Sequence, residues 1–223
     1  MDWSPVLISM KTASVSIVIT FFLGILAAWL VVSLKSPVWR AVVDGLLTLP
    51  LVLPPTVAGF FLLYLLGVKR PLGQFFLEYF SVKIPFSWGA TVIAAVTMSF
   101  PLMYRSARGA FEQVDQNLVQ AARTLGMGEW TIFRRILMAN ALPGIVGGGV
   151  LAFARGFGEF GATAMIAGNI AGRTRTLPMA VYSEVAAGNL ENAYGYVAVM
   201  VVMAFLAVTV MNGAAAGKKP GGR

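Results

Sequence analysis

The chain has 223 residues, of which 58% are apolar and 12% are charged, and its mean hydropathy is +0.78. This charged fraction is about half that of soluble domains, so the composition indicates an integral membrane protein. The sequence has neither cysteine nor histidine, which excludes disulfides, thiol or imidazole catalysis and the usual zinc and haem ligands. We therefore expect no metal and no cofactor. The net charge of +8 is scattered among apolar segments, so no nucleic-acid partner is expected.

Five segments are apolar over enough residues to cross a bilayer as helices, since a span needs about 20 residues. They cover residues 12–34, 44–66, 86–107, 137–157 and 193–212. Continuous apolar runs favour helices over a barrel, whose strands alternate. The prediction is an all-α, polytopic membrane bundle of five to six transmembrane helices, forming one domain over residues 1–213. Residues 214–223 are expected to form a flexible basic tail.

Three prolines interrupt the second predicted span, in the sequence LPLVLPPTVAG at residues 49–59. Proline removes an amide donor and leaves a carbonyl free, which lipid cannot satisfy. One interpretation is a kinked helix that serves only packing. The other is a broken helix that lines a pathway or gate near the middle of the membrane, with Pro54, Pro55 and Thr56 at the break.

Basic residues are distributed unequally between the two ends of the predicted spans. With the N-terminus outside, ten lysines and arginines lie on the inner side and six on the outer side. The positive-inside rule then places the C-terminus and the loop at residues 111–135 in the cytoplasm. The predicted location is the inner (plasma) membrane.

The loop at residues 111–135 is predicted to carry a short amphipathic helix. An apolar stripe at helical spacing is formed by Val114, Leu118, Ala121, Ala122 and Leu125. A capping box of Asn117 and Gln120 is expected to start the helix, and Gly126 to end it before Trp130. A helix lying on lipid headgroups is one interpretation. The alanines and the neighbouring acidic residues favour a groove on another protein instead.

Two charges lie at membrane depth in the fourth span. Arg155 and Glu159 are four residues apart on one helix face, close enough for an ion pair. Charges at this depth face a bundle interior, so the pair either fixes two helices together or contacts a solute in a pathway. Gly158 and Gly161 allow a close helix approach or a hinge.

The segment at residues 158–192 is apolar but short and rich in glycine. It is expected to form a re-entrant or interfacial hairpin, or half of a sixth span. On its predicted outer side lie Arg173 and Arg175, with Thr174 and Thr176 beside them. Such donors suit a tetrahedral oxyanion. Contact with an acidic surface of another protein and plain solvation are the alternatives.

The loop at residues 111–135 resembles the cytoplasmic EAA loop of ABC importer permeases. Ala121, Ala122, Gly126 and Ile136 match its spacing, whereas Gln120 replaces the family glutamate. In that family the loop is a coupling helix that docks into a cleft of an ATP-binding subunit. The resemblance implies that coupling to an ATPase involves Gln120, Ala121, Ala122, Leu125, Gly126 and Trp130.

Over residues 9–213 the stretches LPLVLPPTVAG, GEFGATAMIAGN and TRTLPMAVY resemble permeases of the molybdate, tungstate and sulfate group, and molybdate permeases most of all. The resemblance implies a type I importer fold that imports molybdate. It also implies a homodimer in membrane lipid, with two cytoplasmic ABC ATPase subunits and a periplasmic or extracellular molybdate-binding protein. A sulfate or tungstate permease is the alternative within transport.

The chain is not expected to hydrolyse ATP itself. The sequence GAAAGKK at residues 213–219 has three residues between its glycines instead of four, and lysine in place of the serine or threonine that holds magnesium. An ATPase therefore has to be a separate subunit. Rival interpretations from other classes are a membrane scaffold and an intramembrane enzyme that uses the Glu159 carboxylate.

Overall fold

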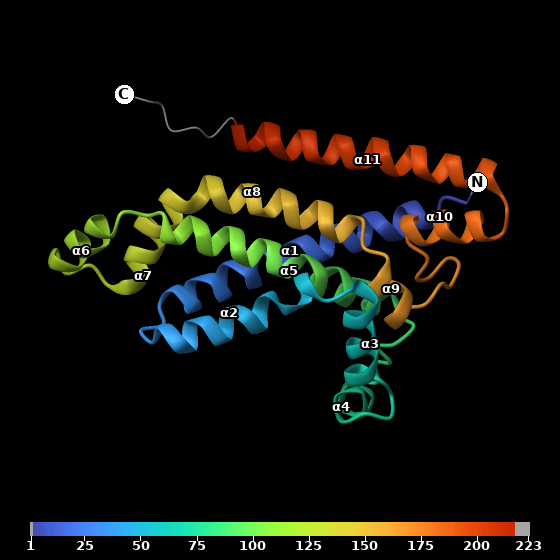
Figure 1. Ribbon diagram of the computed structural model, residues 1–223, viewed down its shortest axis with the longest axis horizontal. Helices are drawn as coiled ribbons and strands as arrows, with labels where there is room; N and C mark the ends of the chain where they lie inside the picture. Colours follow the sequence, from blue (N-terminus) through green and yellow to red (C-terminus); the bar gives the residue numbers. More distant parts are fainter. Residues whose placement is uncertain (1, 217–223) are drawn as a thin grey trace.

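A computed structural model describes residues 2–216, with side chains up to residue 213, and no strand occurs within that range. The predicted tail at residues 214–223 begins inside the last helix and otherwise lies outside the described residues. Three long helices, α1 (Ser4–Val32), α5 (Trp88–Glu112) and α8 (Met138–Phe157), lie side by side with α5 packed against both others (Figure 1). The predicted all-α bundle is confirmed.

Small residues let these helices approach closely. A Cβ atom added to Gly24 of α1 would lie 2.6 Å from Cγ of Met103 in α5, which is closer than real contacts allow. Hydroxyl groups also join the two helices, since the side chains of Thr20 and Ser99 are hydrogen-bonded at 3.0 Å. In a bilayer, where lipid is as apolar as leucine, close packing and polar contacts of this kind hold helices together.

Three helical segments of the described chain are long and apolar enough to cross a membrane: α1, the continuous helix Glu129–Phe157, and Leu190–Gly213 of α11 (Leu190–Ala216). They contain most of the predicted spans 12–34, 137–157 and 193–212. The predicted span 86–107 corresponds to α5, whose 25 residues suffice for about 37 Å of helix. It is less apolar than α1 or α11, because α1 and α8 cover much of its surface.

The predicted span 44–66 is not one straight helix. It consists of α2 (Pro37–Val52) and α3 (Pro55–Leu66), which bend by 112° at Leu53 and Pro54. Leu53 is extended, with φ of −71° and ψ of 141°, because a residue before proline avoids the helical region. The pair adds a fourth span only if it is counted as one crossing. The short helix α4 (Pro71–Phe80), which periodicity did not predict, follows α3.

The remaining short helices gather at opposite ends of the bundle (Figure 1). One end carries α6 (Gln116–Thr124), α7 (Glu129–Ile132) and the π-helical turn η1 (Phe133–Leu137). The other carries α10 (Leu177–Ala186), and α9 (Gly161–Ile166) lies towards it. With six and ten residues, α9 and α10 extend only about 9 and 15 Å, too short to cross a bilayer. The segment at residues 158–192 is therefore a helical hairpin and not a further span.

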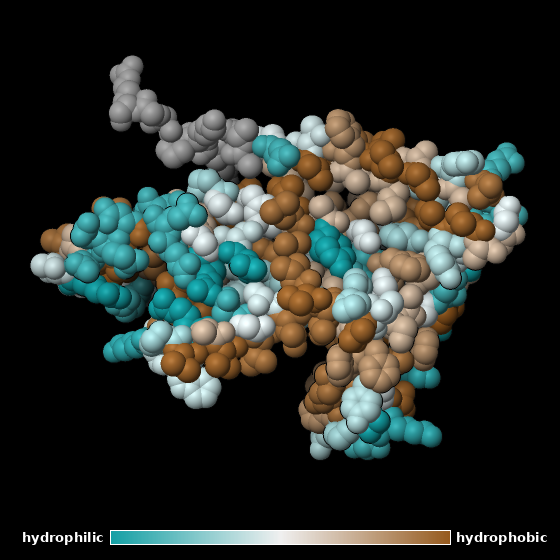
Figure 2. Space-filling model, viewed as in Figure 1, coloured by the Kyte–Doolittle hydropathy of each residue, from teal (hydrophilic) through white to brown (hydrophobic). Residues whose placement is uncertain are grey.

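Figure 2 shows hydrophilic side chains gathered over the α6 and α7 end, whereas hydrophobic side chains cover the middle of the molecule. Large apolar residues are exposed along α1 and α11, among them Phe22, Leu26, Val201 and Phe205. Exposed apolar area on this scale is stable only against lipid or another protein. The surface thus has the pattern of a membrane protein with one polar end outside the hydrocarbon.

Candidate functional site

Helix α6 begins one residue earlier than predicted, and Asp115 is its cap. The Asp115 carboxylate accepts a hydrogen bond from the amide of Asn117 at 2.9 Å, which satisfies a free donor of the first turn. The predicted capping box of Asn117 and Gln120 is therefore wrong, because the aspartate already fills that role. Gly126 ends the helix as predicted, with a left-handed φ of +75°.

The predicted apolar stripe of α6 is divided between two faces. Ala122 is buried, together with Val119, against the side chains of α7 and η1. Leu118, Ala121 and Leu125 are exposed, and the exposed fraction of Leu125 reaches 80%. These three residues, which we call the outer ridge, lie on one face because they are three and four positions apart. One face of α6 thus holds the helix in place and the other is open for a partner.

An ion pair closes the turn between α6 and α7. Arg123 Nε lies 2.8 Å from Glu129 Oε1, and Arg123 Nη2 lies 3.1 Å from Glu129 Oε2. The Arg123 guanidinium holds the pKa of the Glu129 carboxyl below its ordinary value. Both side chains are exposed, so the pair is a weak clamp rather than a source of stability.

Trp130 and Phe133 connect this end to the long helices. Phe133, in η1, packs against Trp130 of α7 at 5.4 Å between ring centroids, Trp29 of α1 at 4.9 Å and Phe111 of α5 at 6.0 Å. Trp130 itself is 64% exposed, so its ring also faces outward at this end of the molecule. Phe133 therefore forms a packed connection from α7 to α1 and α5.

A cavity of about 610 Å³ lies beside the outer ridge, between the ends of α5 and α8. Leu118 of the ridge lines it, together with Arg105, Ser106, Gln113 and Asn140. The ridge therefore adjoins a hollow with both apolar and polar walls. Such a surface suits a protein partner that inserts a side chain.

Three of the predicted pathway residues, Pro55, Thr56 and Gly161, come together at the bend between α2 and α3. A Cβ atom on Gly161 would lie 2.9 Å from Cβ of Pro55, and one on Gly59 would lie 2.7 Å from Cα of Ala162. Helices α3 and α9 therefore meet without space for a side chain between their backbones. Pro54 and Thr56 are exposed at this joint.

Glu159 fixes the corner between α8 and α9. Its side chain is only 1% exposed, Oε2 pairs with Arg155 Nη1, and Oε1 accepts a hydrogen bond from the amide of Ala162 at 2.7 Å. The predicted ion pair is confirmed, and both carboxylate oxygens are used within the chain. This geometry supports the structural interpretation of the pair over contact with a solute. Gly158, the cap at the end of α8, is exposed beside it.

Arg173 and Arg175, which are predicted from the sequence to lie on the outer side, differ in their surroundings. Arg175 Nε donates to Asn169 Oδ1 at 2.8 Å, whereas Arg173 is exposed. The hydroxyl of Thr174 is used by the loop itself, since it accepts from the Ile170 amide at 3.0 Å. Of the four predicted donors, Arg173 is therefore the one that is most open to a ligand or a partner.

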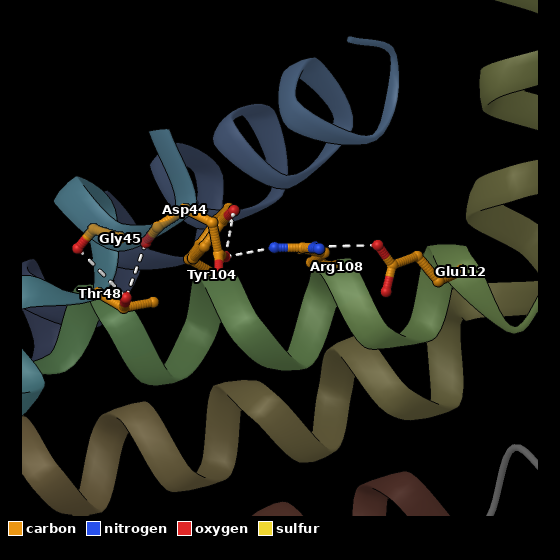
Figure 3. Close-up of polar contacts among 6 residues, drawn as sticks. All are labelled: Asp44, Gly45, Thr48, Tyr104, Arg108 and Glu112. Atoms are coloured by element: carbon orange, nitrogen blue, oxygen red, sulfur yellow. Dashed lines mark hydrogen bonds and ion pairs between the residues drawn. The ribbon is translucent and has the colours of Figure 1, made fainter. Parts of the chain in front are cut away.

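Sequence reasoning missed a charge network between α2 and α5 (Figure 3). Tyr104 donates its hydroxyl proton to Asp44 Oδ1 at 2.9 Å, and Arg108 forms an ion pair with the same oxygen. Arg108 Nε also pairs with Glu112 Oε1 at 2.9 Å. Two signals were available: an aspartate inside an apolar segment, and the four-residue spacing of Arg108 and Glu112.

Comparison with known proteins identifies the family. Residues 20–217 match the model of the binding-protein-dependent transport system inner membrane component. The molybdenum transport system permease protein ModB of Escherichia coli K12 is 47% identical over 182 residues, which cover 82% of this chain and 79% of ModB. The sulfate transport system permease protein CysW of Synechocystis is 33% identical over 208 residues, which cover 93% of this chain and 74% of CysW.

A solved structure shares the fold. A chain of the MetNI methionine ABC transporter, in an inward-facing conformation, aligns with a TM-score of 0.74 and 16% identity over 97% of this chain and 95% of that one. The expected type I importer permease architecture is thereby confirmed. The family match covers most of the sequence, and the chain therefore belongs to the binding-protein-dependent transport system inner membrane components, the membrane-embedded permeases of importers.

Proposed function

We propose that the chain is the permease of an ABC importer that moves molybdate into the cytoplasm, while a separate subunit hydrolyses ATP. The proposed coupling to the ATPase rests on one observation, the exposed outer ridge on α6. The choice of molybdate rests on the higher identity to the molybdenum permease than to the sulfate permease.

The outer ridge is the proposed docking surface for the ATPase. Its apolar residues stand among charged side chains such as Arg123 and Glu129, and Figure 2 shows this end as hydrophilic. A helix lying in lipid headgroups would instead be flanked by a broad apolar surface. The exposed Leu125 and Trp130 supply the kind of apolar and aromatic anchors that dominate protein interfaces.

The proposed orientation places the α6 and α7 end in the cytoplasm and the N-terminus outside. The connection between α1 and α2 and the first turn of α2 lie towards the same end of the bundle as α6 (Figure 1). These segments carry Lys35 and Arg40. Arg105 and Arg108, at the end of α5, add to this basic end. The arrangement agrees with the positive-inside rule, which concentrates lysine and arginine in short cytoplasmic loops.

The proposed assembly is a homodimer with two ATPases inside and an oxyanion-binding protein outside. Arg173 on the outer loop is placed to meet either the anion or an acidic surface of the binding protein. A deep, tight site in the membrane would trap a dianion, so selectivity is expected mainly in the binding protein. Movement of α6 would reach α1 and α5 through Phe133, and the α3–α9 joint would reshape the pathway.

Reconstitution tests this proposal. The chain is placed in liposomes with its ATPase and binding protein, and ATP-driven uptake of molybdate is measured in the presence of sulfate or tungstate. We expect uptake that excess sulfate does not suppress. Suppression of molybdate uptake by an equal concentration of sulfate would favour a sulfate permease. A chain that binds no ATPase and transports no anion would be a scaffold.

A further inference from the structure

The Asp44–Arg108 network, formed by Asp44, Tyr104, Arg108 and Glu112, joins α2 to α5 (Figure 3). The Tyr104 side chain is fully buried, and the Arg108 and Asp44 side chains are 22% and 31% exposed. Their opposite charges neutralise one another, and Glu112 adds a second negative group. An anion would find no net positive charge here, so the network is not a binding site for the transported ion.

Apart from the network, the polar contacts of α2 with other elements in the described chain are the hydrogen bonds from Arg40 Nη2 to the carbonyls of Val32 and Leu34, at 3.0 and 2.9 Å. They hold the first turn of α2 to the end of α1 and not to α5. None of the α2 residues is buried, although Val43 and Leu47 pack against the apolar core between α1 and α5. Apolar surfaces can slide past each other at little cost in free energy. An ion pair whose carboxylate also accepts a hydrogen bond from a hydroxyl is satisfied in only one relative position of the two helices. The network therefore sets the register of α2 along α5.

The network also lies between α6, the proposed docking helix, and the bend between α2 and α3. Arg108 is one turn before Glu112, where α5 ends, and α6 begins at Gln116. Asp44 is in the middle of α2, which runs from there to the bend at Leu53 and Pro54. A displacement of α5 at its α6 end is thus applied to α2 at Asp44.

We propose that Asp44 and Arg108 form a strut that makes α2 and α5 move as one body, so that movement of α6 reaches the bend before α3. This inference rests on the proposed function. Both residues act as positioning residues, because they fix helices relative to each other and do not touch the ion.

The test compares molybdate uptake and ATP hydrolysis in the same liposomes, using the complete complex with its ATPase and binding protein. Asp44→Asn keeps the size of the side chain and removes its charge. We expect uptake per ATP hydrolysed to fall by about five-fold or more, with ATP hydrolysis itself changed less than about two-fold. Glu191→Gln is the control, because it removes an exposed carboxylate in the first turn of α11, outside the network, and should leave uptake per ATP unchanged.

A second variant separates coupling from folding. The chain contains no cysteine, so Asp44→Cys with Arg108→Cys gives one addressable thiol pair. We expect low uptake per ATP before bridging and recovery once a bifunctional thiol reagent joins the two side chains. Unchanged uptake per ATP in Asp44→Asn, or no recovery after bridging, would overturn the strut. If the wild-type complex transports no molybdate, the proposed function is wrong. If the wild type transports molybdate and the variants behave like it, only the strut is wrong.

Discussion

Glycine has opposite roles at the α6–α7 end and at the joint where α3 meets α9. A Cβ atom on Gly126 or Gly128 would meet no atom within 4 Å, and Gly126 has the left-handed φ of +75° that favours glycine, so it serves backbone conformation at an open surface. A Cβ atom on Gly59 or Gly161 would collide with the opposing helix. The first region leaves one face exposed, and the second has no free space between its helices.

This difference matches two separate tasks. A surface that receives a partner needs exposed apolar side chains on a helix that is held on its other face, as Leu125 and Ala122 are. A joint that transmits a helix movement needs close packing without gaps, because closely packed interiors transmit strain. Substitutions at the joint should therefore affect the fold, and those at the outer ridge should affect only assembly.

The largest expected effect is at the corner beside the joint. Glu159→Ala leaves Arg155 without its partner and the Ala162 amide without its acceptor, inside the bundle. Breaking a fully buried pair costs about 3–5 kcal/mol, and the cost here is expected at the lower end because the Arg155 side chain is 27% exposed. We expect a strong loss of folded protein in detergent, measured by thermal unfolding. Glu191→Ala, at an exposed glutamate in the first turn of α11, is the control and should unfold like the wild type.

Gly59→Val tests the tightness of the joint directly. The added atoms meet the backbone of Ala162, and overpacking of this kind costs about 1–3 kcal/mol. Gly45→Val in α2 carries the same helix-propensity cost but faces open space. Equal unfolding temperatures for the two variants would show that α3 and α9 are not packed as described.

Leu125→Ser addresses the open region. We expect the affinity for the ATPase subunit to fall by about tenfold, since an exposed anchor is lost, while the unfolding temperature stays that of the wild type. Binding is measured by titration of the purified ATPase onto the permease in nanodiscs. Leu190→Ser, at an exposed leucine that begins α11 at the other end of the bundle, should bind the ATPase normally. Loss of affinity in both variants would argue against a localised docking surface.

The smallest effect is expected at the Arg123–Glu129 clamp. Because Arg123 lowers the pKa of Glu129, the clamp contributes above the ordinary carboxyl pKa of 4.5 and is lost as the pH falls through the lower pKa of the folded protein. At pH 7, Glu129→Gln should slightly increase hydrogen exchange of the α6 amides relative to the wild type. Well below pH 4.5 the two proteins should exchange alike, and a difference that persists there would exclude the charge as its cause.

The sequence predicted the features that depend on local chemistry. Continuous apolar runs located α1, α8 and α11, and the consecutive Pro54 and Pro55 located the break, because proline acts on its own neighbourhood. The spacing of Arg155 and Glu159 predicted their ion pair for the same reason. The 112° angle was not predictable, since it depends on what α3 packs against.

Two of the missed features depend on contacts between distant residues. Periodicity placed Leu118 and Ala122 in one stripe, but only the position of α7 decides which of them is covered. Asp44 and Arg108 are 64 positions apart, so no local pattern joins them, and their pairing needs the packing of α2 on α5. Periodicity also failed to predict α4, which follows the bend.

The central claim is that the outer ridge faces the cytoplasm and is covered by the ATPase. Since the chain has no cysteine, Leu125→Cys creates one thiol, which a membrane-impermeant maleimide can label in intact cells and in inside-out vesicles. We predict labelling only in inside-out vesicles, and protection when the ATPase subunit is bound. Labelling from outside intact cells, or labelling that the bound ATPase does not slow, would contradict the account.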